Sequence, residues 1–178
     1  MATAGSEMLP RHAISRGRAW GLFAGFIGVC VISAAIADWR ERHMMMINSS
    51  DSLPNWAFLI ERGATPHRGD YVFFEPPTIA LIRRHFGNKP RLFGKIVYGM
   101  PGDVVAHRGP SVIINGRSVA TMKPRTRLGE ALTPGKTGVI PAGCYYAGTP
   151  HPDGFDSRYS EIGFVCGRQI VGTGEALL

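Results

Sequence analysis

The sequence predicts a mainly β domain of antiparallel strands over residues 38–178, preceded by one transmembrane helix over residues 19–37. Three observations support this fold class. Residues 19–37 carry no charge, and most of the chain's 23 Gly and 13 Pro come after them. Frequent turn formers favour short strands over long helices. The apolar fraction of 44% is high enough for a packed core and argues against general disorder.

The uncharged segment 19–37 reads AWGLFAGFIGVCVISAAIA. At about 1.5 Å per residue, a helix of this length nearly spans a hydrocarbon core. Trp20 and Trp39 stand at its two ends, where aromatic residues meet the membrane interface. The A-x-A motif at 35–37 leaves a cleaved signal peptide as the alternative. We favour a retained anchor because the run is long for the apolar region of a signal peptide.

Charge asymmetry predicts the topology. Three arginines precede the run against one acid, Glu7, whereas the charges of residues 38–42 balance. An excess of positive charge marks the cytoplasmic side of a membrane helix. We therefore expect residues 1–18 in the cytoplasm and residues 38–178 outside.

The exported part contains two cysteines, Cys144 and Cys166. In an oxidising periplasm they could form one disulfide, or they could be two buried thiols in separate strands. The sequence alone leaves both alternatives open.

Short segments rich in aromatic and β-branched residues predict the strands of the domain. These segments are 57–61, 70–75, 95–99, 103–107, 111–115, 138–140, 144–148, 164–166 and 169–172. Asn115-Gly116 predicts a type I′ hairpin turn. Residues 78–86 have apolar residues at helical spacing and predict a short helix or flap. Residues 122–138 are polar and turn-rich, which predicts a long excursion.

The composition excludes several classes of function. The net charge is +7, but the basic residues are scattered and no motif organises them. We therefore expect no nucleic-acid partner, and a solvated basic surface that also suits an anionic membrane. The histidines and cysteines lack metal-ligand spacing, so we expect no metal and no cofactor. Residues 135–137 read GKT, but Glu130 stands where a phosphate-binding loop needs its first glycine. A Ser–His–Asp arrangement using His151 stays open.

Three segments carry the candidate chemistry: S-D-S-L-P at 50–54, GKIVYGMPGD at 94–103 and GTPHPDGFDSRYSEIG at 148–163. In the second, Lys95 opens an apolar strand. Burying a lysine is costly, and desolvation favours the neutral amine that can accept a proton. Each segment also has a purely structural interpretation. The first could be a serine-rich turn, the lysine of the second could lie on the solvent face of its strand, and the Asp and Arg of the third could be an ion pair that braces a loop.

Together the three segments resemble the type I signal peptidase superfamily of serine proteases, which use a Ser–Lys dyad. They are most similar to its conjugative-transfer branch, the TraF-type peptidases. The order of the segments, the position of Lys95 eight residues before Asp103 and the sequence DSRY all agree with that branch. The resemblance covers residues 48–172 and implies an antiparallel β-sheet peptidase domain of the signal peptidase type.

The resemblance also implies roles for individual residues. Ser52 would be the nucleophile and Lys95 its general base. The main-chain N–H of Ser52 and the hydroxyl of Ser50 would hold the oxyanion. Asp156 would belong to the catalytic group and keep the site in shape, with Arg158 as its partner.

The expected function is a membrane-anchored serine endopeptidase that processes a secreted precursor, with a conjugative pilin as the favoured substrate and cyclisation as a possible outcome. Its expected location is the bacterial inner membrane, with the catalytic domain in the periplasm. Its partners would be the precursor protein and the lipid bilayer. The alternatives are a general type I signal peptidase and a non-catalytic anchored β scaffold of a secretion system.

Two positions depart from the family pattern. Trp56 stands near a position where the TraF branch has glycine. Gly154 stands where standard signal peptidases have a serine two residues before the late aspartate. The second departure removes an expected partner of Lys95.

Overall fold

The computed structural model describes residues 16–177 and divides into two units, residues 1–40 and 41–178. Helix α1 (Arg16–Arg42) contains the predicted segment 19–37 and is about 40 Å long. Its apolar side chains, Phe23 and Ile32 among them, are exposed. Within the described residues it is the one helix long and apolar enough to cross a membrane. Most of the predicted cytoplasmic segment 1–18 lies outside the described residues.

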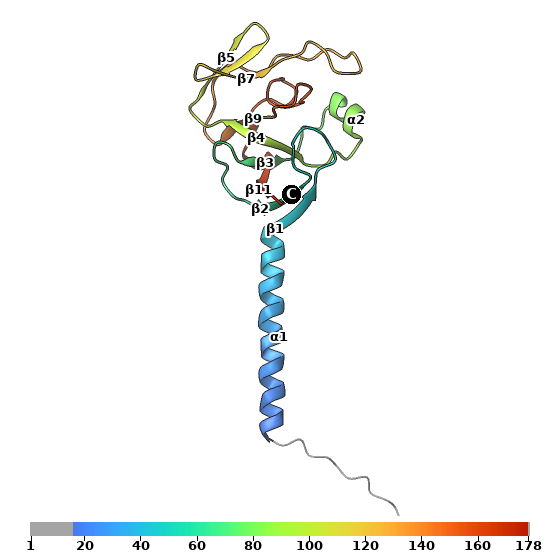
Figure 1. Ribbon diagram of the computed structural model, residues 1–178, viewed down its shortest axis with the longest axis vertical. Coiled ribbons are helices and arrows are strands. Elements are labelled where there is room, and N and C mark those ends of the chain that lie inside the picture. Colours follow the sequence, from blue (N-terminus) through green and yellow to red (C-terminus); the bar gives the residue numbers. More distant parts are fainter. Residues whose placement is uncertain (1–15, 178) are drawn as a thin grey trace, which may run out of the picture. The chain divides into compact units, whose positions relative to one another are not determined.

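The second unit is built from two antiparallel sheets, which confirms the predicted fold class (Figure 1). The larger sheet has seven strands in the order β1-β2-β11-β3-β4-β9-β10, and the smaller has the order β7-β6-β5-β8. The strands are β1 (His43–Ile47), β2 (Ala57–Arg62), β3 (Tyr71–Phe74), β4 (Phe93–Gly99), β5 (Val104–Arg108), β6 (Ser111–Ile114), β7 (Arg117–Thr121), β8 (Gly138–Val139), β9 (Cys144–Gly148), β10 (Val165–Cys166) and β11 (Ile170–Ala176). A short 3₁₀ helix, η1 (Gly167–Gln169), precedes β11.

Three local predictions are confirmed. Asn115 and Gly116 both have positive φ, 48° and 81°, as a type I′ turn between β6 and β7 requires. The segment 78–86 forms helix α2 (Ala80–Phe86), which buries Ile82 and ends at Gly87. Residues 122–138 form the predicted excursion, held to the rest of the domain by a bridge between Pro134 and Tyr159.

The sequence did not predict β1. Its residues HMMMI pair with β2 in continuous register from His43 opposite Glu61 to Ile47 opposite Ala57. Methionine runs carry little strand propensity, so pairing with β2 decides this element. The strand leads directly into the loop that carries Ser52.

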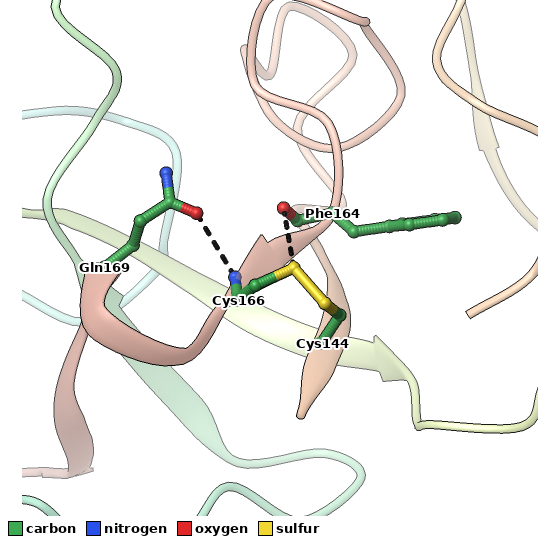
Figure 2. The surroundings of a disulfide bond; sticks show 4 residues. All are labelled: Cys144, Phe164, Cys166 and Gln169. Carbon is green, nitrogen blue, oxygen red and sulfur yellow. Dashed lines mark hydrogen bonds between the residues drawn. A yellow bond between two sulfur atoms is a disulfide. The ribbon is translucent and has the colours of Figure 1, made fainter. Parts of the chain in front are cut away.

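Cys144 and Cys166 form a disulfide, which settles the alternative left open by the sequence (Figure 2). The S–S distance between Cys144 on β9 and Cys166 on β10 is 2.09 Å. The main-chain N–H of Cys166 donates to the side-chain carbonyl of Gln169 at 3.2 Å. The bond fixes the strand β10 to β9, and β9 leads into the loop of residues 149–158.

Candidate active site

Asn48 shapes the loop between β1 and β2 that carries both serines. Its amide nitrogen donates to the carbonyls of Leu53 at 3.0 Å and Asn55 at 2.9 Å. Its amide oxygen accepts the main-chain N–H of Ser50 at 3.1 Å. Leu53 is buried and packs in a core cluster with Phe58 of β2. The loop is therefore a fixed turn that presents its serines in one arrangement.

The hydroxyls of Ser50 and Ser52 form a hydrogen bond with each other. Ser50 Oγ lies 2.9 Å from Ser52 Oγ and donates to Asn48 Oδ1 at 3.1 Å. A hydroxyl carries one proton, so the bond from Ser50 to Asn48 makes Ser52 the donor to Ser50. The Ser52 N–H makes no hydrogen bond within residues 16–177. This leaves one main-chain donor free beside the Ser52 hydroxyl.

Lys95 is a buried amine on β4. It is 5% exposed, and its Nζ lies 5.9 Å from the centre of the Phe93 ring. Burial lowers the pKa of Lys95 from 10.5 to about 8; Asp156 opposes this shift and Arg158 adds to it. Among the described residues, no side chain or carbonyl forms a hydrogen bond or ion pair with Nζ. A buried amine of this kind is a candidate general base near neutral pH.

Two contacts bring the serine loop to Lys95. A Cβ on Gly94, the residue before Lys95, would lie 3.2 Å from a methyl group of Leu53, the residue after Ser52. On the other side, Thr149 donates its hydroxyl to the main-chain carbonyl of Ser52. Thr149 follows Gly148, which pairs with Ile96 across β9 and β4. These two contacts hold the loop next to β4 at the level of Lys95, although no hydrogen bond joins Lys95 to Ser52 among the described residues.

Asp156 and Arg158 form a buried ion pair that braces the loop after β9. Arg158 Nε donates to Asp156 Oδ1 at 2.8 Å, and Arg158 Nη2 donates to Asp156 Oδ2 at 2.9 Å. Nη2 also donates to the carbonyl of Thr149 at 2.7 Å, and Nη1 donates to that of Thr121 at 3.1 Å. Burial raises the pKa of Asp156, and the Arg158 guanidinium opposes that rise. Neither side chain lines the cavity described below.

Thr149, like Asn48, is a residue of this site that the sequence motifs do not predict. It is buried, its main-chain N–H donates to Asp156 Oδ2 at 3.0 Å, and its carbonyl accepts from Arg158. Its hydroxyl accepts the N–H of His151 at 3.2 Å and donates to Ser52. It therefore connects the buried ion pair to the main chain of Ser52. Its place after a strand, in a turn-rich segment, was the sole signal in the sequence.

Gly154 has no room for a side chain. A Cβ at this position would lie 2.1 Å from Thr149 Cγ2 and 3.0 Å from Asp156 Oδ2. The methyl group of Thr149 therefore occupies the space into which a serine at 154 would project. The other departure from the pattern, Trp56, is 55% exposed and does not line the cavity.

A cavity of about 650 Å³ opens beside these residues. Ser50, Ser52 and Lys95 line it together with Gly154. Its apolar wall comes from helix α2, the start of β4, the excursion and the loop after β9. These apolar residues are Leu81, Phe86, Leu92, Phe93, Leu132 and Phe155. A serine hydroxyl, a partly deprotonated amine and an apolar groove together can support acyl transfer.

His151 also lines the cavity, but the structure does not join it to Ser52. Its Nδ1 accepts the main-chain N–H of Asp153 at 3.1 Å, and no hydrogen bond between His151 and Ser52 occurs within residues 16–177. A Ser–His–Asp triad is therefore not assembled. In the same residues, no group of three or more His, Cys, Asp or Glu side chains could hold a metal ion.

Comparison with known proteins places the chain in a family. Residues 17–178 match the family described as signal peptidase, peptidase S26. The crystal structure of a signal peptidase I from Enterococcus faecalis V583 is 25% identical and covers 61% of this chain and 96% of that chain, with a TM-score of 0.36. No curated protein matches this chain in sequence. The family match includes every residue of the candidate site, and members of this family are serine endopeptidases. The chain therefore belongs to the signal peptidase family, peptidase S26, and is a peptidase that acts on precursor proteins.

Proposed function

We propose that Ser52 is the nucleophile of this peptidase and Lys95 its general base. The observation that carries the proposal is the state of Lys95: 5% exposed, without an ion-pair or hydrogen-bond partner among the described residues, with a pKa lowered to about 8, and lining the same cavity as Ser52. A lysine buried for packing alone would be expected to have a compensating partner. A role as general base explains the burial of Lys95, because burial favours the neutral amine that can accept a proton.

The chemistry follows in two proton transfers. Lys95 takes the proton of the Ser52 hydroxyl as Oγ attacks the scissile carbonyl, then gives that proton to the leaving amine. The free Ser52 N–H donates to the developing oxyanion, and Ser50 becomes the second donor when its proton turns away from Asn48. Thr149 and the Asp156–Arg158 pair do not line the cavity. Their role is to position the main chain of Ser52, which the Thr149 hydroxyl holds directly.

Helix α1 serves as the membrane anchor in this proposal. Its exposed apolar side chains need an apolar surrounding, and the arginine excess before it puts the catalytic unit outside the cytoplasm. The oxidised Cys144–Cys166 pair suits a periplasmic domain. A bacterial inner-membrane location, with the N-terminus in the cytoplasm, accounts for all three observations.

We further propose that the substrate is a pilin precursor and that the enzyme belongs to the TraF-type branch. The support is the S-x-S sequence at 50–52 with a single residue between Ser52 and Pro54. In that branch the pilin's own amine attacks the acyl-enzyme in place of water, which yields a cyclic product. A general type I signal peptidase that removes signal peptides is the second candidate, favoured by the family match itself.

Mass spectrometry of a pilin precursor co-expressed with wild type, Ser52→Ala or Lys95→Ala tests the proposal. We expect wild type to shorten the precursor and both variants to leave it intact. A shortened product lighter by one water indicates cyclisation, and a linear product supports hydrolysis. Equal processing by all three proteins contradicts the dyad. A non-catalytic scaffold predicts that both variants keep full function.

A further inference from the structure

The cavity beside Ser52 and Lys95 carries an excess of positive charge. Five exposed basic side chains that line it, here called the basic rim, come from two segments. Lys89 and Arg91 lie between α2 and β4, and Lys123, Arg125 and Arg127 lie on the excursion. The carboxylates lining the cavity are Asp51 and Asp153.

Asp153 neutralises part of the rim on the excursion side. It accepts from Arg127 Nε at 2.9 Å and Nη2 at 2.6 Å, and it also accepts from Lys123. These two cations lower the pKa of Asp153 to about 2, so the carboxylate stays charged. One carboxylate between two cations leaves a net positive charge. The nearby Glu130 is paired with Arg84 and His85, at 2.9 Å and 2.6 Å, and not with a cation of the rim.

The remaining cations of the rim have no acidic partner among residues 16–177. Lys89 and Arg91 are exposed and form no ion pair, and Arg125 donates to the carbonyl of Gly129 at 2.7 Å. Exposed cations do not need a partner, but these face one groove with apolar walls. A groove of one sign with low-dielectric walls concentrates its field and attracts the opposite charge.

We propose that the basic rim selects precursor segments that carry Asp or Glu close to the scissile bond. The inference rests on the proposed peptidase function and names a feature of its substrate. The apolar wall would hold the residues next to the cleaved bond, and carboxylates on the flanking residues would pair with Lys89 and Arg91 or with the excursion. The occupant is a polypeptide and not a lipid, because the rim borders the groove that contains Ser52 and Lys95.

The test uses the full chain in phosphatidylcholine nanodiscs and peptides spanning the cleavage site of a processed precursor. Each peptide carries two Glu on one side of the scissile bond or the isosteric pair of Gln. We expect kcat/KM to be about threefold to tenfold higher for a Glu peptide than for the Gln peptide at low salt, mostly through a lower KM. The difference should shrink in about 0.5 M salt, because salt screens the attraction between exposed charges.

Charge reversal separates the rim from general surface charge. Lys89→Glu with Arg91→Glu should remove or invert the ratio of kcat/KM for the Glu peptide to kcat/KM for the Gln peptide. The matched control is Arg108→Glu with Arg117→Glu, two exposed arginines of the smaller sheet that do not line the cavity. This control removes the same charge and should leave the preference intact.

Equal rates for Glu and Gln peptides would overturn the inference and leave the peptidase proposal standing. A loss in the rim variant that occurs only when the nanodiscs contain phosphatidylglycerol would assign the cations to lipid and overturn it too. If wild type cleaves no peptide and no precursor, the proposed function itself fails, and the substrate preference fails with it.

Discussion

The hydroxyl of Thr149 donates a hydrogen bond to the main-chain carbonyl of Ser52, ninety-seven residues away in sequence. The same threonine receives its position from Asp156 and Arg158 through its own N–H and carbonyl. The late DSRY segment therefore acts on the serine loop through one buried side chain. This contact gives the ion pair a role in positioning Ser52 without any contact with the cavity.

Replacing Thr149 with valine tests this role. The change keeps the shape of the side chain and removes its hydroxyl, so Ser52 loses a main-chain partner. We expect kcat to fall about tenfold to a hundredfold with KM nearly unchanged, because the loss is one of nucleophile orientation. Thr149→Ser keeps the hydroxyl and should keep kcat within a few-fold. Steady-state kinetics on one peptide decides, and equal kcat values for the two variants would refute the role.

Gly154 offers a second test of the same contact. Gly154→Ala places a Cβ 2.1 Å from Thr149 Cγ2 and should lower both activity and stability. Thr149→Ser removes that methyl group, so the double variant should recover most of the activity lost by the alanine. The measurement is kcat/KM of the single and double variants, analysed as a double-mutant cycle. Additive effects would show that the two residues do not share this space.

The pKa of Lys95 predicts the pH dependence of the reaction. A general base must be neutral, so kcat/KM should rise about tenfold per pH unit below about 8 and level off above it. The pH profile of wild type and His151→Gln provides the measurement. In both proteins kcat/KM should rise over the same pH range. A rise in kcat/KM with pH that is present in wild type and disappears in His151→Gln would instead identify His151 as the base.

Lys95 should also lower the stability of the folded protein at neutral pH. Its pKa of about 8 lies below the ordinary 10.5, so between these values the unfolded chain binds more protons than the folded protein. Stability therefore rises with pH across this window. The lowered pKa of Lys95 reduces the free energy of unfolding by roughly 3 kcal/mol at pH 7, and roughly half of this reduction remains at about pH 9.5.

Lys95→Met is the variant that measures this effect. Urea unfolding in detergent should show the variant more stable than wild type at pH 7, by a margin that shrinks as the pH approaches 10.5. Ser52→Ala is the matched control, because it should be equally inactive and leaves the buried amine in place. A margin that does not change with pH would mean that the amine is not desolvated.

The sequence predicted the architecture because its signals are local. Strand propensity, the Asn115-Gly116 turn and the uncharged run 19–37 each depend on neighbouring residues, and the structure contains all of these elements. The strand β1 was missed because its methionines take their conformation from pairing with β2. The disulfide needed the register that places Cys166 opposite Cys144, which the sequence does not contain.

The sequence predicts several residues of the candidate site but not the hydrogen bonds that hold them in place. Ser52, Lys95 and Asp156 were named from motif order, whereas Asn48 and Thr149 act through contacts that only the fold creates. Gly154 looked like a missing partner of Lys95 in the sequence. In the structure it is a required gap, because Thr149 fills the space beside it. The roles of Ser52 and Lys95 remain predictions.

The most direct test of the central claim is peptide mapping of enzyme quenched with acid during turnover of a precursor. The account predicts that the peptide containing Ser52 gains the mass of the acyl fragment in wild type. Fragmentation should place that mass on Ser52, and Lys95→Ala should show none. Acylation of Ser50 or of any other residue, or acylation that persists without Lys95, would contradict the Ser52–Lys95 mechanism.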